Sequence, residues 1–217
     1  MQRGYLGYFA ANWPPKRPRD AAQGGGDMKA AIVSRWTREP LLSVELARSL
    51  RDLNAVFLEL EGVVAARLAA LSPAQRAIIA NCPYALFDLR FHDHEHWRRN
   101  LRGAGGCCVA ETPAGEQRVV AFVRVVLFYA WHLATTARHE ASLLFGIPES
   151  TADVFAETSP AQLMSIAAMQ TVNLSARWSH CEAYWGSLAD AAERADRANL
   201  RRVQLSGLQL VAAARLP

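Results

Sequence analysis

One segment of this chain occurs twice, and the two copies keep the same spacing over more than thirty residues. The tetrapeptide Ser-Pro-Ala-Gln stands at residues 72–75 and again at 159–162. When 66–101 is aligned without gaps to 153–188, ten of the 36 positions are identical. Such an internal repeat is expected to fold as related units, so it constrains every other expectation about the fold.

The matches outside the tetrapeptide are spread along the whole alignment. The identities pair Ala69 with Ala156, Ile79 with Ile166, Ala80 with Ala167, Arg90 with Arg177, Glu95 with Glu182 and Leu101 with Leu188. Apolar character is kept where Leu68 aligns with Phe155, Phe91 with Trp178 and Trp97 with Tyr184. We therefore predict two tandem, related units within one chain.

The repeated tetrapeptide is a helix start. Serine at the N-cap accepts a hydrogen bond from a free backbone N–H, and proline at the first helical position loses nothing by lacking its own N–H. Glutamine three residues after the serine can reach back to the N-cap backbone. Each copy is therefore expected to begin a helix, at Ser72 and at Ser159.

Apolar residues that recur every three or four positions predict two long helices. The first spans 43–68, with a stripe formed by Leu46, Leu50, Leu53, Phe57, Leu60, Val64 and Leu68. The second spans about 117–145, and Gly146 is placed to end it in a left-handed cap. Ser150 is expected to start a short helix after it.

A short extended piece is expected between the first capped helix and the histidines that follow it. Phe87, Leu89 and Phe91 alternate with Asp88 and Arg90, a period typical of a strand. The piece is too short to change the fold class. The prediction is an all-α protein built from two tandem units, each with a long amphipathic helix and shorter capped helices.

These patterns set the expected boundaries. Residues 1–27 are predicted to be disordered, or an untranslated leader before Met28, because they contain prolines, basic residues and a glycine triplet without apolar periodicity. The first helical unit is expected at 41–102 and a glycine-containing linker at 103–116. The second unit is expected at 117–191, followed at 192–217 by a helical tail suited to packing or to a partner.

Composition indicates a soluble cytoplasmic protein. The four cysteines contain no C-x-x-C pair, which disfavours a zinc module and a disulfide framework alike. No segment has the pattern of a signal peptide, and the apolar run 119–131 is too short to span a bilayer. The net charge of +4 permits an anionic partner such as DNA without requiring one.

The cluster His92-Asp93-His94-Glu95-His96 is the strongest chemical candidate in the sequence. On a helix, His92 and His96 would share a face and could bind a transition metal if further ligands came from elsewhere. The aligned positions of the second copy keep only the glutamate, which favours a solvated polar turn over a metal site. A protonation-sensitive partner surface is a third alternative.

The second copy resembles the family of the flagellar transcriptional regulator FlhD, the partner of FlhC. The resemblance covers about residues 119–191 and is carried by Leu133-Ala134, by the run Glu140-Ala141-Ser142-Leu143-Leu144-Phe145-Gly146-Ile147, by Ala152, by Ser159-Pro160-Ala161-Gln162-Leu163, and by Ala176-Arg177-Trp178 with His180. The first copy has the same ending, Arg90-Phe91, but lacks the Gly-Ile-Pro turn and the short helix.

The resemblance implies a non-enzymatic, all-α transcriptional regulator without a cofactor or a resident metal. It would act through a protein partner of FlhC type, or by self-association, and directly or indirectly on promoter DNA. Family members resemble a single unit, so two units in one chain could pair with each other as a pseudo-dimer. The alternatives are a helical adaptor without DNA binding and, from another class, a metal-dependent enzyme using His92–His96.

The candidate partner or DNA surface consists of Arg90, Phe91, Arg177, Trp178 and His180. Arg90 and Arg177 recur in register, and a large aromatic residue follows each of them. Such a surface would meet a partner protein or a phosphate backbone. The alternative is a structural arginine paired with a carboxylate such as Glu95 or Glu182, and an aromatic patch that belongs to the core.

Overall fold

The computed structural model describes residues 44–60, 62–64, 66–102 and 116–213. The expected leader at 1–27, the cysteines at 107 and 108, and all of the expected linker at 103–116 except Glu116 lie outside these residues. The chain divides into two units, Met1–Ala47 and Arg48–Pro217. The packing described below is that of the second unit.

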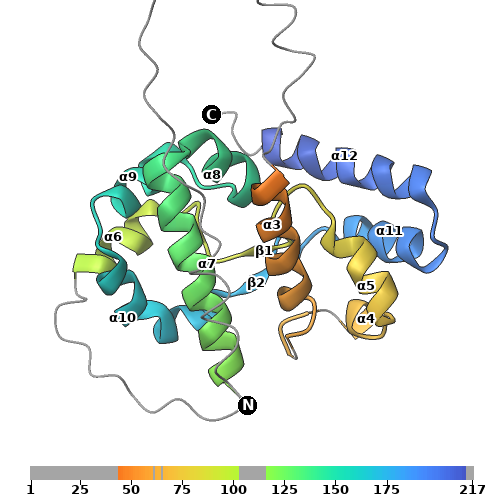
Figure 1. Ribbon diagram of the computed structural model, residues 1–217, viewed down its shortest axis with the longest axis horizontal. Helices are drawn as coiled ribbons and strands as arrows, with labels where there is room; N and C mark the ends of the chain where they lie inside the picture. Colours follow the sequence, from red (N-terminus) through yellow and green to blue (C-terminus); the bar gives the residue numbers. More distant parts are fainter. Residues whose placement is uncertain (1–43, 61, 65, 103–115, 214–217) are drawn as a thin grey trace, which may run out of the picture. The chain divides into compact units, whose positions relative to one another are not determined.

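The described residues are mostly helical, which confirms the all-α character of the prediction (Figure 1). The elements in chain order are α3 (Val44–Phe57), α4 (Ala66–Ala69), α5 (Pro73–Ala80), β1 (Phe87–Asp88), α6 (His94–Arg102), α7 (Gln117–Thr136), α8 (Arg138–Phe145), α9 (Glu149–Ala156), α10 (Pro160–Gln170), the 3-10 helix η2 (Thr171–Asn173), β2 (Ser175–Ala176), α11 (Glu182–Glu193) and α12 (Arg197–Ala213).

Helix α7 is the centre of one group of helices and packs mainly against α10, α9 and α8. Its buried residues are Val120, Phe122, Val123, Val126, Leu127, Tyr129, Ala130, Leu133 and Ala134. Among the described residues, α7 alone is long and apolar enough to cross a membrane by length and composition, and half of its apolar stretch is buried in the protein. Burial on this scale is typical of a core helix.

Helices α5, α11 and α12 form a second group, in which α11 packs against both α12 and α5 (Figure 1). The contact face of α12 is a narrow stripe of Val203, Gly207 and Val211, spaced four residues apart. A Cβ atom on Gly207 would lie 2.0 Å from the Tyr84 hydroxyl oxygen. Glycine therefore lets α12 approach the segment before β1 closely.

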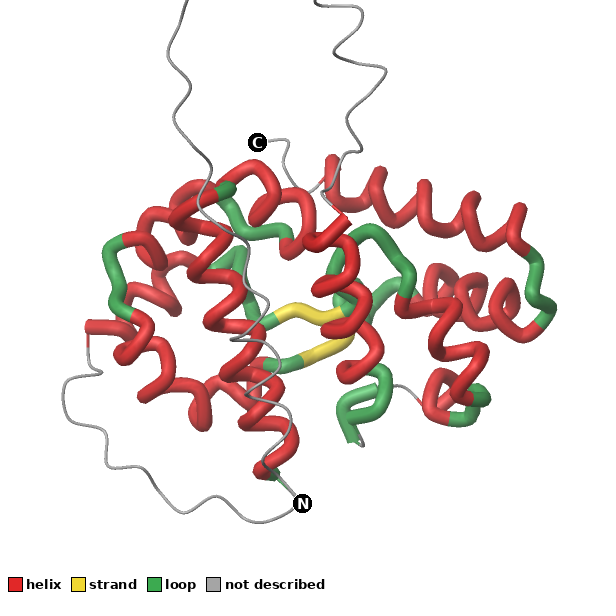
Figure 2. Tube along the Cα trace, in the orientation of Figure 1, coloured by secondary structure: helices red, strands yellow, loops and turns green. Residues whose placement is uncertain are grey.

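The two strands form an antiparallel ribbon between these groups, drawn in yellow in Figure 2. Phe87 lies opposite Ala176, and Asp88 lies opposite Ser175. The Phe87 ring is fully buried and contacts the rings of Phe57 and Phe122 at centroid distances of 5.6 and 5.1 Å. The predicted extended piece at 87–91 is thus confirmed only at Phe87–Asp88, because Arg90 has a left-handed φ of 57°.

The predicted helix starts at the two serines are confirmed. Ser72 Oγ accepts from Gln75 N at 3.3 Å, and Ser72 N donates to Gln75 Oε1 at 2.8 Å. Ser159 and Gln162 repeat this capping box, with distances of 3.3 and 3.0 Å. Gly146 ends α8 in the left-handed conformation, with φ of 69°, as the sequence predicts.

Both long helices predicted from periodicity are wrong in length. The first ends at Phe57 and gives way to turns that contain Gly62, whose φ is 76°. Leu58 and Leu60 are nevertheless buried, so the apolar spacing continues through a turn that is not helical. The second breaks at Ala137, where φ is −152° and ψ is 63°, and α8 begins there as a separate helix.

Candidate partner surface

The antiparallel pairing places the turns that follow β1 and β2 at opposite ends of the ribbon. Chain direction reverses between paired strands, so the chain leaves β1 toward Arg90 at one end and leaves β2 toward Arg177 at the other. The two arginines are aligned in sequence. They nevertheless belong to two separate local environments, which differ from each other in burial and in partners.

Arg90 lies in the exposed turn before α6, with φ of 57°. Its Nη2 is 2.7 Å from Asp93 Oδ2. Asp93 Oδ1 also accepts from His96 N at 2.9 Å, and this hydrogen bond, with Arg90 nearby, lowers the pKa of the Asp93 carboxyl. The Arg90 side chain is accessible and belongs to the turn that starts α6.

Phe91 is a core residue, which corrects its assignment to a surface. Its side chain is 0% exposed and its ring contacts those of Trp97, Phe145 and Phe155. The Phe91 carbonyl accepts from Thr151 Oγ1 at 2.7 Å. An aromatic side chain after Arg90 is therefore required for packing between α6 and α9, and it is not available to a partner.

Arg177 is also buried, with 7% exposure, and it too is corrected as a surface residue. Its Nη1 donates to the Leu144 carbonyl at 3.0 Å, and its backbone N donates to Leu86 O at 2.9 Å. A Cβ atom on Gly146 would lie 2.3 Å from Arg177 Nη2, so glycine makes room for the guanidinium. The positive charge lies at the C-terminal end of α8, where the helix dipole favours it.

Trp178 and His180 differ in accessibility. Trp178 is half-buried, has φ of 53°, and lies between the rings of Tyr84 and Tyr184 at centroid distances of 5.4 and 5.2 Å. The Arg177 guanidinium lies 4.8 Å from the Trp178 ring centroid. His180 is exposed. Of the five predicted residues, Arg90 and His180 are thus exposed, at opposite ends of the ribbon.

The feature that recurs at the two arginines is a backbone contact. Trp97 Nε1 donates to the Arg90 carbonyl at 3.1 Å, and Trp185 Nε1 donates to the Arg177 carbonyl at 3.0 Å. The sequence alignment pairs Trp97 with Tyr184, one residue before the tryptophan that makes the matching contact. Each indole fixes the turn between its strand and the helix after it.

The three histidines of the 92–96 cluster have different neighbours. His92 Nδ1 lies 3.8 Å from Asp88 Oδ2, His94 Nε2 lies 3.2 Å from Glu95 Oε1, and His96 Nε2 forms a 2.9 Å hydrogen bond with Gln170 Oε1. Within the described ranges, no three His, Cys, Asp or Glu side chains are grouped closely enough to hold a metal ion. His96 instead joins α6 to the buried Gln170 at the end of α10.

Two buried tyrosines and a cysteine form a polar cluster beneath α12. The hydroxyl oxygens of Tyr84 and Tyr184 are 2.9 Å apart, and Tyr84 Oη donates to Gln204 O at 3.3 Å. Burial raises the pKa of the Cys82 thiol to about 12 and raises the pKa of both tyrosine hydroxyls. These groups are therefore neutral at pH 7, and Cys82 is a structural thiol with little nucleophilic character.

This cluster predicts a loss of stability in alkali. A buried thiol with a raised pKa favours the folded state fully below its unfolded value of 9.0, and this contribution is lost as the pH rises toward about 12. We expect the free energy of unfolding to fall by up to about 1.4 kcal/mol per pH unit from each such group. Urea unfolding at pH 8 to 11 measures this slope. Between pH 9 and 10 the Cys82→Ala variant should show a smaller slope, and equal slopes would contradict the prediction.

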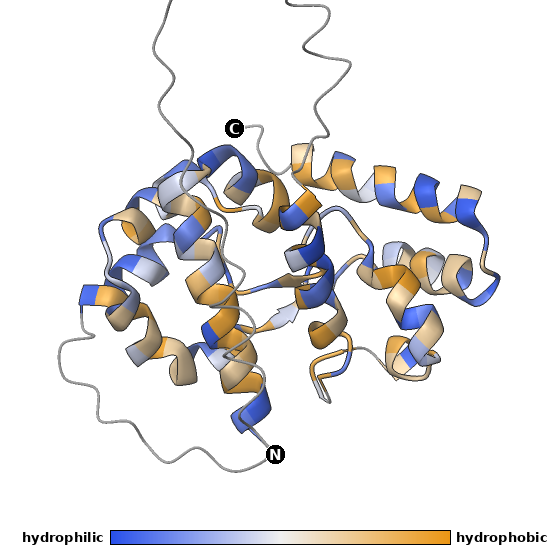
Figure 3. Ribbon diagram, in the orientation of Figure 1, coloured by the Kyte–Doolittle hydropathy of each residue, from blue (hydrophilic) through white to orange (hydrophobic). Residues whose placement is uncertain are grey.

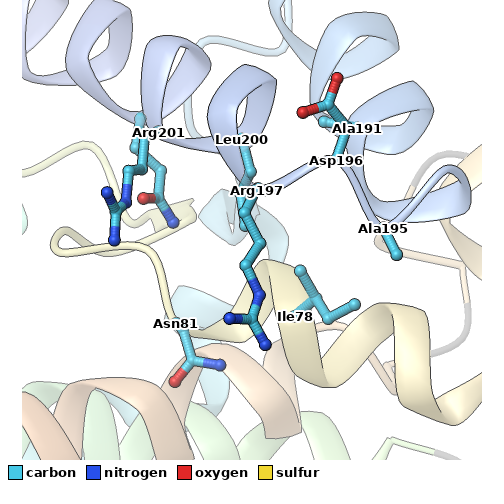
Figure 4. Close-up of a pocket in the computed structure, with 9 residues that line it drawn as sticks. Ile78, Asn81, Ala191, Ala195, Asp196, Arg197, Leu200 and Arg201 are labelled. Atoms are coloured by element: carbon cyan, nitrogen blue, oxygen red, sulfur yellow. The ribbon is translucent and has the colours of Figure 1, made fainter.

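A hollow of about 480 Å³ lies between the end of α5 and the turn from α11 into α12. It is lined by Ile78, Asn81, Ala191, Ala195, Asp196, Arg197, Leu200, Arg201 and Gln204. Figure 4 shows Arg197 extending from α12 toward Ile78 and Asn81, with Arg201 one turn further along the helix. The sequence predicted only a packing or partner tail at 192–217 and did not predict this hollow. The absence of Asp and Glu from 197–217 could have indicated that α12 is basic.

Comparisons of the chain with protein-family models, curated proteins and solved structures found no match. The resemblance to the FlhD family accordingly rests on the residues that carry it. Any functional assignment depends on those residues together with the contacts described above.

Proposed function

We propose that this chain is an FlhD-like transcriptional regulator in which two related units pair within one polypeptide. It acts through a protein partner of FlhC type and, directly or indirectly, on promoter DNA. The observation that carries the proposal is the pairing of β1 with β2, each of which follows one of the Ser-Pro-Ala-Gln helices.

The register of this pairing supports a pseudo-twofold relation between the units. Asp88 and Ser175 are aligned with each other in the sequence repeat, and they also lie directly opposite each other across the ribbon. Equivalent residues on a twofold axis have this relation. Both halves contain a serine-capped helix, then a short strand, then a helix, although the second half has α8 and α9 before its capped helix and η2 before its strand. The tryptophan contact to an arginine carbonyl is also common to both halves.

A pseudo-dimer changes what the protein requires from its partners. In a family whose members resemble a single unit, pairing needs a second chain and depends on concentration. Here the two strands that pair are joined by one polypeptide, so the pairing is intramolecular. We therefore expect the purified chain to behave as one copy, of 23.9 kDa, until a different protein binds it.

A helical adaptor without DNA binding is the second candidate. It is favoured by exposed apolar side chains at the junction of α10 and η2, where Met169 is 45% and Val172 is 86% exposed. Exposed apolar side chains that lie near each other can contribute to a surface that binds another protein. No contact among the described residues supports the metal-dependent enzyme.

Affinity purification of the tagged chain from its native host tests the proposal. We expect a second regulator of FlhC type to co-purify, and promoter DNA to be recovered with it and released by added salt. Recovery of a stable protein partner without DNA would favour the adaptor. Absence of both a regulator and DNA would contradict the proposed function.

A further inference from the structure

Helix α12 is exposed along one of its sides. Its contact with the rest of the second unit runs along the stripe Val203, Gly207 and Val211, and Leu205 on the opposite side is 60% exposed. With 17 residues the helix is about 26 Å long. A helix held along one narrow stripe can present its other side to a long, continuous partner.

The exposed side of α12 is basic. Arg197, Arg201 and Arg202 are exposed, and the helix contains no Asp or Glu. Hydrophilic positions, blue in Figure 3, are concentrated toward the start of α12. In the part of the chain that the structure describes, no carboxylate forms an ion pair with any of the three. The preceding Asp196 accepts from the backbone N–H groups of Ala198 and Asn199 at 3.0 Å, so its carboxylate caps the helix.

Several other exposed arginines of the second unit have acidic partners, although Arg99 and Arg124, which are also exposed, form no ion pair among the described residues. Arg118 Nη2 lies 2.6 Å from Glu59 Oε2, Arg138 Nη1 lies 2.5 Å from Asp153 Oδ1, and Arg67 contacts Asp190. The three arginines of α12 differ from these because, among the described residues, no neighbouring carboxylate neutralises their charge. These arginines can bind an external anion without the free-energy penalty of breaking an internal ion pair.

The positions of the arginines suit a ligand with negative charge along both of its sides. Arg197 and Arg201 are one turn apart on one flank of α12, beside the hollow of Figure 4. Arg202 is rotated by about 100° from Arg201, onto the other flank, and Leu205 lies between the flanks. The major groove of B-DNA admits an α-helix and has a phosphate backbone on each side.

We infer that the exposed face of α12 is a docking surface for duplex DNA, with Arg197, Arg201 and Arg202 contacting phosphates. This rests on the proposed function and deepens it, because it makes the DNA contact direct and assigns it to one helix. Charge complementarity favours DNA over an apolar protein surface, since guanidinium groups pair with phosphates in a bidentate manner. Phosphate contacts of this kind position a protein on the duplex.

The test compares two triple variants that remove the same charge. One is Arg197→Gln with Arg201→Gln and Arg202→Gln on α12. The control is Arg98→Gln with Arg99→Gln and Arg102→Gln on α6, whose arginines are also exposed. Circular dichroism first establishes that each variant melts at the same temperature as the wild type. Binding to a fluorescein-labelled 24-base-pair duplex is then measured by fluorescence anisotropy at 50 to 200 mM NaCl, with and without the co-purified partner.

We expect the α12 triple variant to lose at least about thirtyfold in affinity at 100 mM NaCl. The slope of log K against log salt should decrease in magnitude by about 2.7, at about 0.9 for each phosphate that is no longer neutralised. The α6 triple variant should stay within about threefold of the wild type. Should the α12 triple variant fold poorly, Arg202→Gln alone is expected to weaken binding by about fivefold and to lower the slope by about 0.9.

Equal losses of affinity in the two triple variants would overturn the inference, because net charge alone would explain them. Undiminished binding by the α12 variant would overturn it too while leaving the proposed function intact. If the α12 variant keeps DNA binding and loses the protein partner, α12 is a protein interface and the inference is wrong. A wild-type chain that binds no duplex, alone or with its partner, would instead contradict the DNA role in the proposed function as well.

Discussion

Replacing Asn54 with leucine is expected to destabilise the protein by about 3–4 kcal/mol. The Asn54 side chain is 0% exposed, and its Nδ2 lies within hydrogen-bond distance of the carbonyls of Ala80, Cys82 and Tyr84, the last at 3.0 Å. Its Oδ1 accepts from Leu86 N at 2.9 Å. One amide thus holds the whole segment that leads from α5 into β1.

Leucine has a similar size, so the substitution removes these hydrogen bonds without opening a large cavity. The Leu86 N–H and the carbonyls would be left buried without Asn54, at about 1–3 kcal/mol for each group that finds no other partner. For a chain of this length the destabilisation corresponds to a fall of about 10 °C in Tm. Calorimetry or urea unfolding measures it.

The matched control is Asn81→Leu. Asn81 is exposed at the end of α5, where its Nδ2 donates to Ala77 O, so the loss of stability there should be within about 0.5 kcal/mol. A free energy of unfolding within about 1 kcal/mol of the wild type for Asn54→Leu would contradict the prediction. It would show that water or a backbone shift supplies the hydrogen bonds that the backbone groups of this segment lose.

Local signals that act within a few residues were readable from the sequence. The capping boxes at Ser72 and Ser159 and the left-handed Gly146 were predicted correctly, because cap chemistry depends on three or four neighbouring residues. The alternation around Phe87 also identified the strand. These features are determined by the backbone and by adjacent side chains, which a single sequence displays directly.

Helix length was not readable in the same way. Apolar residues continue at helical spacing past Phe57 and past Ala137, yet the backbone leaves the helix at both places. Leu58 and Leu60 reach the core from turns, so they satisfy the same burial requirement as helical residues would. Periodicity reports which residues are buried, and it cannot distinguish a helix from a turn that buries the same side chains.

The accessibility of the candidate surface residues was not readable from the sequence, because burial depends on contacts between distant segments. Arg177 is buried through its contact with Leu144, 33 residues earlier in the chain, and nothing adjacent to Arg177 indicates this. Phe91 is covered by α9, which belongs to the other half of the chain. The sequence therefore displays the repeated pair of an arginine and an aromatic residue, but it does not display which of these side chains are accessible.

The in-register pair Arg90 and Arg177 gives the second large prediction, because the same substitution should destabilise the protein strongly at Arg177 and little at Arg90. Arg177→Met keeps much of the apolar side-chain length and removes the buried guanidinium, its hydrogen bond to Leu144 O and its cation–π interaction with the Trp178 ring. A buried hydrogen bond from a charged group contributes about 1.5–3 kcal/mol. Because the cation–π interaction is removed as well, we expect the free energy of unfolding to fall by about 3 kcal/mol.

Arg90→Met is the matched control, because the same substitution falls on an exposed arginine in the aligned position. Its ion pair with Asp93 is solvent-accessible, so stability should change little. Urea unfolding of the two variants, measured beside their binding to the co-purified partner well below Tm, separates a structural role from a surface role. Equal small changes in stability with equal reductions in partner binding would support two matching surfaces after all. A large loss of stability confined to Arg177→Met would instead establish that the repeated arginine serves packing in one half and a helix-start turn in the other.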